Sequence, residues 1–186
     1  HDALPISEAT WYPNIEAAIA AKAMDAVLIA TPGQFHEPVL VPALEADLPI
    51  LCEKPLTPDA ASSRAIVDLE VAKGKQLIQV GFMRRFDAGY ENLRELVQSG
   101  KQGELLGLHC AHRNPAVPDT YHNDMLVFDS IVHEIDVVRF LTDSPIKSVE
   151  IKHMKRNALS PERLNEPILA LLETESGILA TVEMNV

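Results

Sequence analysis

The sequence lacks several features, and each absence excludes a class of protein. No apolar run approaches the roughly 20 residues that a membrane-spanning helix needs, so no membrane association is expected. Cationic residues are few, with 16 Lys and Arg against 27 Asp and Glu, and the net charge of −11 argues against nucleic acid or anionic membranes as partners. Hydrophobic residues make up 47% of the chain, which is enough for a buried core.

Cysteine is also scarce, and the pattern of histidines does not indicate a metal. The two cysteines, Cys52 and Cys110, lie in apolar runs without a partner at metal-site spacing, so we expect reduced, buried thiols and a cytoplasmic protein. There is no H-E-x-x-H motif, and no two histidines share a helical face. We therefore expect no metal, with a site of two histidines and one carboxylate as the alternative.

Helical and strand-like segments alternate in the first half of the chain. The predicted helices span 14–23, 36–46 and 57–73, and the predicted strands span 25–30, 49–52 and 76–82. Thr57 is predicted as the N-cap of the third helix and Gly74 as its C-cap. The first two strands are continuous apolar runs, which is typical of strands buried on both faces. The alternation predicts a parallel, Rossmann-type α/β sheet.

The pattern changes near residue 83. The second half predicts helices at 88–98 and 124–141 and strands at 104–113, 147–154, 167–174 and 178–185. Ser176 and Gly177 separate the last two apolar runs and predict a hairpin. This half is therefore expected to be an α+β domain with a mostly antiparallel sheet.

Two loops follow predicted parallel strands at the edge where such sheets bind ligands, Thr31–His36 and Glu53–Pro55. Pro55 favours an extended backbone at Lys54, which would hold this lysine at the strand end. A lysine there either stabilises negative charge on a substrate oxygen or is an ordinary surface residue.

The predicted helix 124–141 carries Asp129, His133 and Asp136 at positions i, i+4 and i+7, so the three lie along one stripe. The rest of the helix is apolar, which predicts burial and a partner for the stripe. Two interpretations are open. Asp129 and His133 form a structural hydrogen bond inside the protein, or His133 is a general base that the carboxylate orients.

Two further polar groups follow strands. Arg84 and Arg85 come after the third predicted strand, where they would bind a phosphate or polyol or be solvated. His112, Arg113 and Asn114 end a later strand with groups of the kind that recognise hydroxyls.

Several motifs together resemble the glucose–fructose oxidoreductase / inositol dehydrogenase family, and in particular its inositol-oxidising members. They are a T-P-G-x-x-H loop, a strand ending in E-K-P, and a later D-x-x-x-H-x-x-D helix, with the segments VGFMRRFDAGY (80–90), HCAHRNP (109–115) and VHEIDVVRFL (132–141). The resemblance covers nearly the whole chain, in the family's order.

The resemblance implies an NAD-dependent enzyme, with NADP as the alternative, that oxidises a secondary hydroxyl of a cyclic polyol such as myo-inositol to a ketone. It implies catalytic roles for Lys54, Asp129 and His133. It implies polyol contacts from Arg84, His112 and Asp136. It implies cofactor contacts from Thr31, Pro32, His36, Glu53, Lys54 and Arg84. Another sugar dehydrogenase of the family and a non-catalytic fragment are the alternatives.

The resemblance also sets the expected domains. Residues 1–82 would be the later part of a dinucleotide-binding domain without its first βαβ unit, because no G-x-G-x-x-G is present. Residues 83–186 would be a substrate-binding domain, incomplete at its end, whose open sheet makes contacts in a homo-oligomer, a dimer or tetramer.

Overall fold

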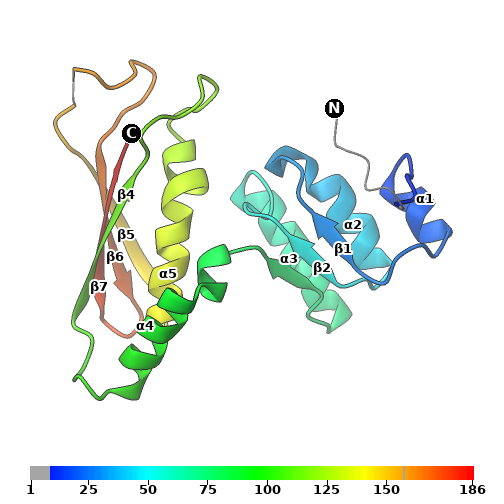
Figure 1. Ribbon diagram of the computed structural model, residues 1–186, viewed down its shortest axis with the longest axis horizontal. Coiled ribbons are helices and arrows are strands. Elements are labelled where there is room, and N and C mark those ends of the chain that lie inside the picture. The colour runs from blue at the N-terminus through cyan, green and yellow to red at the C-terminus, as the bar shows by residue number, and fades with distance from the viewer. Residues whose placement is uncertain (1–8, 157) are drawn as a thin grey trace. The chain divides into compact units, whose positions relative to one another are not determined.

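The computed structural model describes residues 9–156 and 158–186. The chain divides into two compact units, one ending at Gly81 and one beginning at Phe82, and each has its own sheet (Figure 1). The two units are described separately below. Within the described ranges, no helix has both the length and the apolarity to cross a bilayer.

The first unit is built around a parallel sheet of three strands in the order β1-β2-β3. The strands are β1 (Val27–Ile29), β2 (Ile50–Cys52) and β3 (Ile78–Val80). They alternate with α1 (Ile15–Ala20), the 3-10 helix η1 (Gly33–Phe35), α2 (Glu37–Glu45) and α3 (Ala60–Lys73). The predicted order and the parallel sheet are confirmed.

The expectation that the first two strands are buried on both faces is wrong. Burial alternates along β1 and β2, and the side chains of Leu28 and Leu51 are exposed. The reason is that the core lies against one face of the sheet, where α2 and α3 supply apolar side chains. This core contains Val27, Ile29, Leu40, Ala43, Leu44, Ile50, Cys52 and Ile66.

The start of α3 also differs from the prediction, because Asp59 and not Thr57 is the N-cap. The Asp59 carboxylate accepts hydrogen bonds from the backbone N–H groups of Ala61 and Ser62, both at 2.9 Å. The Thr57 hydroxyl instead lies 2.6 Å from that of Ser63. Gly74 is the C-cap with φ 64°, as predicted, because glycine adopts the left-handed conformation without strain.

The second unit has a sheet of four strands in the order β4-β7-β6-β5. The strands are β4 (Gly107–Arg113), β5 (Ile146–His153), β6 (Ile168–Thr174) and β7 (Leu179–Asn185). β4 runs parallel to β7, and the other pairs are antiparallel. The hairpin predicted between β6 and β7 is confirmed, with Gly177 in its turn at φ 85°.

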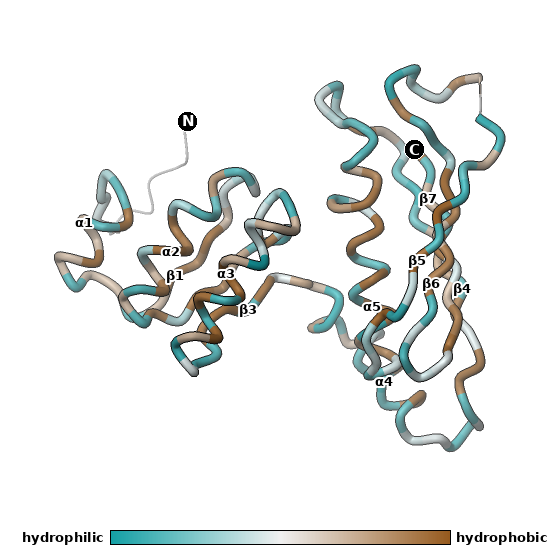
Figure 2. The backbone as a smooth tube through the Cα atoms, turned by 180° about the vertical axis from the view of Figure 1, so that it is seen from behind, coloured by the Kyte–Doolittle hydropathy of each residue, from teal (hydrophilic) through white to brown (hydrophobic). Residues whose placement is uncertain are grey.

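Helices precede and cover this sheet. They are the 3-10 helix η2 (Met83–Phe86), α4 (Ala88–Ser99), the π-helix η3 (Leu126–Ile131) and α5 (Val132–Thr142). Hydrophobic residues recur along α5 and the strands (Figure 2). The core includes Ile131, Val138, Leu164, Leu172, Val182 and Met184. Several large apolar side chains are nevertheless exposed on the strands, namely Val149, Ile151, Leu171 and Leu179.

Candidate active site

The helix predicted over 124–141 is two helices of different kinds. Leu126–Ile131 forms a π-helix, and the α-helix α5 begins at Val132. Asp129 therefore lies in the π-helix and His133 in the α-helix, with the change of helix type between them. That Asp129 orients His133 stays a prediction. His133 and Asp136 are buried on α5, as a mostly apolar helix requires. Asp129 is half-buried.

Asp136 is held by Arg85 of η2. Nε of Arg85 donates to Oδ2 at 2.9 Å and Nη2 donates to Oδ1 at 2.7 Å, the two-point geometry typical of an Arg–carboxylate pair. The hydrogen bonds that Arg85 donates to Asp136 raise the pKa of Arg85. Both carboxylate oxygens are thus engaged by Arg85 within the second unit, and the contact of Asp136 with a polyol stays a prediction.

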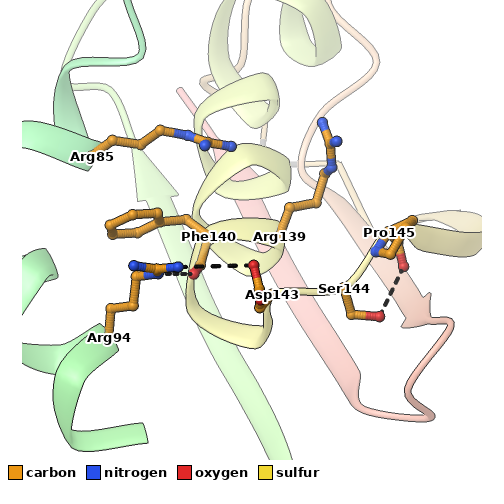
Figure 3. Close-up of a pocket in the computed structure, with 7 residues that line it drawn as sticks. All are labelled: Arg85, Arg94, Arg139, Phe140, Asp143, Ser144 and Pro145. Carbon is orange, nitrogen blue, oxygen red and sulfur yellow. Dashed lines mark hydrogen bonds and ion pairs between the residues drawn. The ribbon is translucent and has the colours of Figure 1, made fainter. Parts of the chain in front are cut away.

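The same arginine lines a cavity of about 320 Å³ at the end of α5 (Figure 3). There the Phe140 ring lies between two guanidinium groups, with its centroid 5.5 Å from Cζ of Arg85 and 4.9 Å from Cζ of Arg94. Nε of Arg94 also donates to the Phe140 carbonyl at 3.0 Å. These contacts fix the Arg85 side chain on α5 and so fix Asp136.

Glu134 contacts two of the predicted polyol residues, although no role is expected for it in the sequence analysis. Nη1 of Arg84 donates to its Oε1 at 2.5 Å, and Nδ1 of His112 lies 2.9 Å from its Oε2. The signal was present in the sequence, because a carboxylate in an otherwise apolar helix must find partners when the helix is buried. The structure therefore brings Arg84 and His112 together around one carboxylate.

In the first unit, His36 joins the two predicted cofactor loops from inside. Its Nε2 lies 2.7 Å from the carbonyl oxygen of Thr31, and its Nδ1 lies 2.8 Å from that of Pro55. The side chain has no exposed surface, so the ring cannot be the direct cofactor contact that was expected. Because the His36 ring lies between a carbonyl of each loop, it holds the two loops at a fixed distance from each other.

Gly33 shows how closely these loops approach. A Cβ atom at Gly33 would lie 3.0 Å from Cγ of Pro55, so the proline ring would have to give way by a small amount. The Lys54–Pro55 peptide bond is cis. Thr31, Pro32 and Glu53 are exposed around this contact, and Lys54 is half-buried. These residues form a polar edge at the carboxyl ends of β1 and β2, where a doubly wound sheet binds its ligand.

Lys54 lies in the first unit, whereas Asp129 and His133 lie in the second. That Lys54 and His133 meet over one substrate oxygen therefore stays a prediction. Across residues 9–156 and 158–186, no three His, Cys, Asp or Glu side chains are grouped so that they could hold a metal ion. Both cysteines are free, with Cys52 buried and Cys110 half-buried.

The chain thus combines a unit with a parallel sheet and a unit whose sheet is covered by a helix with buried polar groups. The chain belongs to the GFO/IDH/MocA family. Residues 6–82 match its oxidoreductase domain with an NAD-binding Rossmann fold, and residues 90–186 match its C-terminal domain.

Individual relatives are similar over nearly the whole chain. The chain is 61% identical over 175 residues to inositol 2-dehydrogenase of Corynebacterium glutamicum. The matched region covers 94% of this chain and 52% of that protein. The chain is 57% identical over 175 residues to inositol 2-dehydrogenase of Leifsonia xyli, with the same two coverages of 94% and 52%. The chain thus spans about half the length of the curated relatives it matches.

Solved structures show the same similarity. Myo-inositol dehydrogenase from Lactobacillus casei, in complex with NAD(H) and myo-inositol, superposes with a TM-score of 0.90 at 36% identity, over 96% of this chain and 53% of that one. Scyllo-inositol dehydrogenase from the same organism, with NAD(H) and scyllo-inositol, gives a TM-score of 0.76 at 25% identity, over 91% and 53%.

Proposed function

We propose that this chain is part of an NAD-dependent oxidoreductase that converts a secondary hydroxyl of a cyclic polyol, such as myo-inositol, to a ketone. The observation that carries this proposal is the 61% identity to an inositol 2-dehydrogenase across 94% of the chain. In this proposal residues 1–82 contribute to the dinucleotide-binding domain and residues 83–186 to the substrate domain, and the protein works in the cytoplasm.

The cofactor would lie along the polar edge of the first unit. Thr31, Pro32, Glu53 and Lys54 would contact it there, together with Arg84, while the buried His36 keeps the two loops at a fixed spacing. NAD, when bound, supplies the acceptor for the hydride that leaves the substrate carbon. The strand-end position and the exposure of these residues suit a nicotinamide dinucleotide.

His133 would take the proton of the reacting hydroxyl, and Asp129 would orient the imidazole. Lys54 would hydrogen-bond the same oxygen and stabilise its negative charge. Arg84 and His112 would hold the other hydroxyls of the ring. Asp136, held in place by Arg85, would also contact the polyol.

A second candidate function is oxidation of another cyclic polyol or sugar by the same groups. The similarity to scyllo-inositol dehydrogenase favours it, because that enzyme binds a stereoisomer of myo-inositol. We also propose a homo-oligomer, since exposed apolar side chains on the strands, among them Val149, Ile151 and Leu179, provide a surface for a second copy.

The test uses protein expressed from the whole reading frame that encodes this chain. NAD-dependent oxidation of myo-inositol is expected, and His133→Ala should lower kcat by roughly 10²–10⁴-fold, the usual contribution of general base catalysis, while NAD still binds. Lys54→Met should also slow turnover. The control is His153→Ala, on the exposed strand β5, which should leave the rate unchanged. Normal turnover by the His133 variant would refute the assignment.

A further inference from the structure

Glu134 is a buried carboxylate that links three elements of the second unit. Its side chain is 4% exposed, and it lies on α5 between Arg84 of η2 and His112 of β4. Each carboxylate oxygen has one of these partners, at 2.5 Å for Arg84 and 2.9 Å for His112. A buried carboxylate is stable only when its charge is paired and its oxygens accept hydrogen bonds, and here both conditions are met.

The contact with Glu134 fixes the tautomer of His112. A carboxylate oxygen only accepts hydrogen bonds, so Nδ1 of His112 must carry the proton. A neutral imidazole has a single N–H group, which leaves Nε2 as an acceptor. Arg84 uses Nη1 for Glu134 and retains other N–H donors on its guanidinium, which lies 5.8 Å from the centre of the Tyr90 ring.

We propose that Glu134 is a positioning residue that holds Arg84 and His112 as a donor and acceptor pair for two neighbouring hydroxyls of an uncharged polyol. Arg84 donates to the oxygen of one hydroxyl, and Nε2 of His112 accepts a hydrogen bond from the other hydroxyl. Glu134 also balances the charge of Arg84, so the pair gives no net attraction to a sugar phosphate or sugar acid. This inference rests on the proposed function and names the substrate class of the same site.

The first test reads the tautomer of His112 by ¹⁵N NMR of the 186-residue chain at mildly alkaline pH. The expected result is a proton on Nδ1 and none on Nε2. A proton on Nε2 would overturn the inference, whether or not the protein oxidises a polyol. Glu134→Gln should disturb this preference, because one amide oxygen cannot serve both Arg84 and His112. Glu134→Asp, which keeps the charge, serves as a second variant if Glu134→Gln does not fold.

The second test measures kinetics with protein from the whole reading frame. Glu134→Gln should raise KM for the polyol about ten- to a hundredfold, as expected for loss of a charge-assisted hydrogen-bond partner. It should raise KM for NAD much less, because Arg84 is only one of several proposed cofactor contacts. Glu134→Asp should restore part of the affinity. The matched control is Glu183→Gln, at the exposed ion pair with Arg113, which should have no effect on KM.

The outcomes separate the inference from the proposed function. An unchanged polyol KM in Glu134→Gln overturns the positioning role. Equal losses for the polyol and NAD show a general structural defect and also overturn it. If the wild-type protein oxidises no polyol, the proposed function fails, and the tautomer of His112 alone decides whether Glu134 fixes that side chain.

Discussion

Arg85 donates to both carboxylate oxygens of Asp136, so η2 is attached to α5 by a two-point ion pair. The Asp136 side chain is 4% exposed, and the guanidinium is about one-third exposed, at 34%. Lysine cannot reproduce this geometry, because its ammonium is a point charge without the planar fork of arginine.

Replacing Arg85 by alanine should therefore destabilise the second unit. It leaves the Asp136 carboxylate buried without its partner, which costs about 3 kcal/mol, the lower end of the range for buried pairs since the guanidinium is partly solvated. Arg85→Lys should lie between alanine and wild type. The change in the free energy of unfolding is measured by urea unfolding, with hydrogen exchange of the α5 amides as the readout. Arg139→Ala, at an exposed arginine of the same cavity, is the control and should have little effect. Equal losses for the two alanine variants would contradict the prediction.

The stability of the first unit should depend on pH through Asp47. Hydrogen bonds from Lys73 and Lys75 lower the pKa of Asp47 from 3.8 to about 2. A lowered pKa in the folded state means that the contribution is complete above about 3.8 and is lost as the pH falls through about 2. A ¹³C titration of the Asp47 carboxyl should give a midpoint near the lower value. In a Lys73→Met, Lys75→Met double variant the midpoint should rise, and an unchanged midpoint would exclude the lysines as the cause.

The two thiols should react slowly and at different rates. Burial raises the pKa of Cys52 to about 11 and also raises the pKa of Cys110 above its ordinary value. The thiolate is the reactive form, so iodoacetamide near neutral pH should label both slowly, and the fully buried Cys52 more slowly. Mass spectrometry of labelled peptides measures the rates, with the urea-unfolded chain as the control. Labelling of Cys52 as fast as in urea would contradict its burial.

Gly74 should be difficult to replace by alanine. Its φ of 64° ends α3 in the left-handed conformation, in open space where no atom would meet a Cβ. Gly74→Ala should therefore cost about 1 kcal/mol from backbone strain alone. Gly74→Asn should cost less, because asparagine tolerates this conformation. Thermal unfolding compares the two, and equal melting temperatures would argue against strain.

The sequence was sufficient for the order of helices and strands because each was marked by local signals. Gly74 ends α3 as expected, and the hairpin around Gly177 follows from two apolar runs separated by turn residues. The N-cap of α3 was harder, since Thr57 and Asp59 both carry suitable oxygens. Only the folded geometry shows that the Asp59 carboxylate reaches two backbone amides. The exposure of Leu28 also depends on which face the helices cover, and this is not encoded in a three-residue strand.

The sequence marks candidate site residues one by one, but it does not show which residues they contact. Arg84, His112 and Asp136 stand out as polar groups at element ends or on an apolar helix. Their partners lie far away in the chain: Glu134 is 50 residues from Arg84 and 22 from His112, and Asp136 is 51 from Arg85. Spacing along one helix cannot reveal such pairs. The π-helix at Asp129 was equally hidden, because its hydrogen-bond register differs from that of an α-helix without a distinctive residue pattern.

The place of β7 in its sheet affects how the protein is made. β7 is the last strand described along the chain, yet it lies between β4 and β6. It pairs with β4 over its whole length, with Leu179 opposite Gly107 and Asn185 opposite Arg113. During translation β4 leaves the ribosome long before this neighbour is synthesised. Until then the backbone groups of β4 are bonded to water or to the strand edge of another chain. Until β7 is made, this edge of β4 is therefore expected to be open to pairing with other newly made chains.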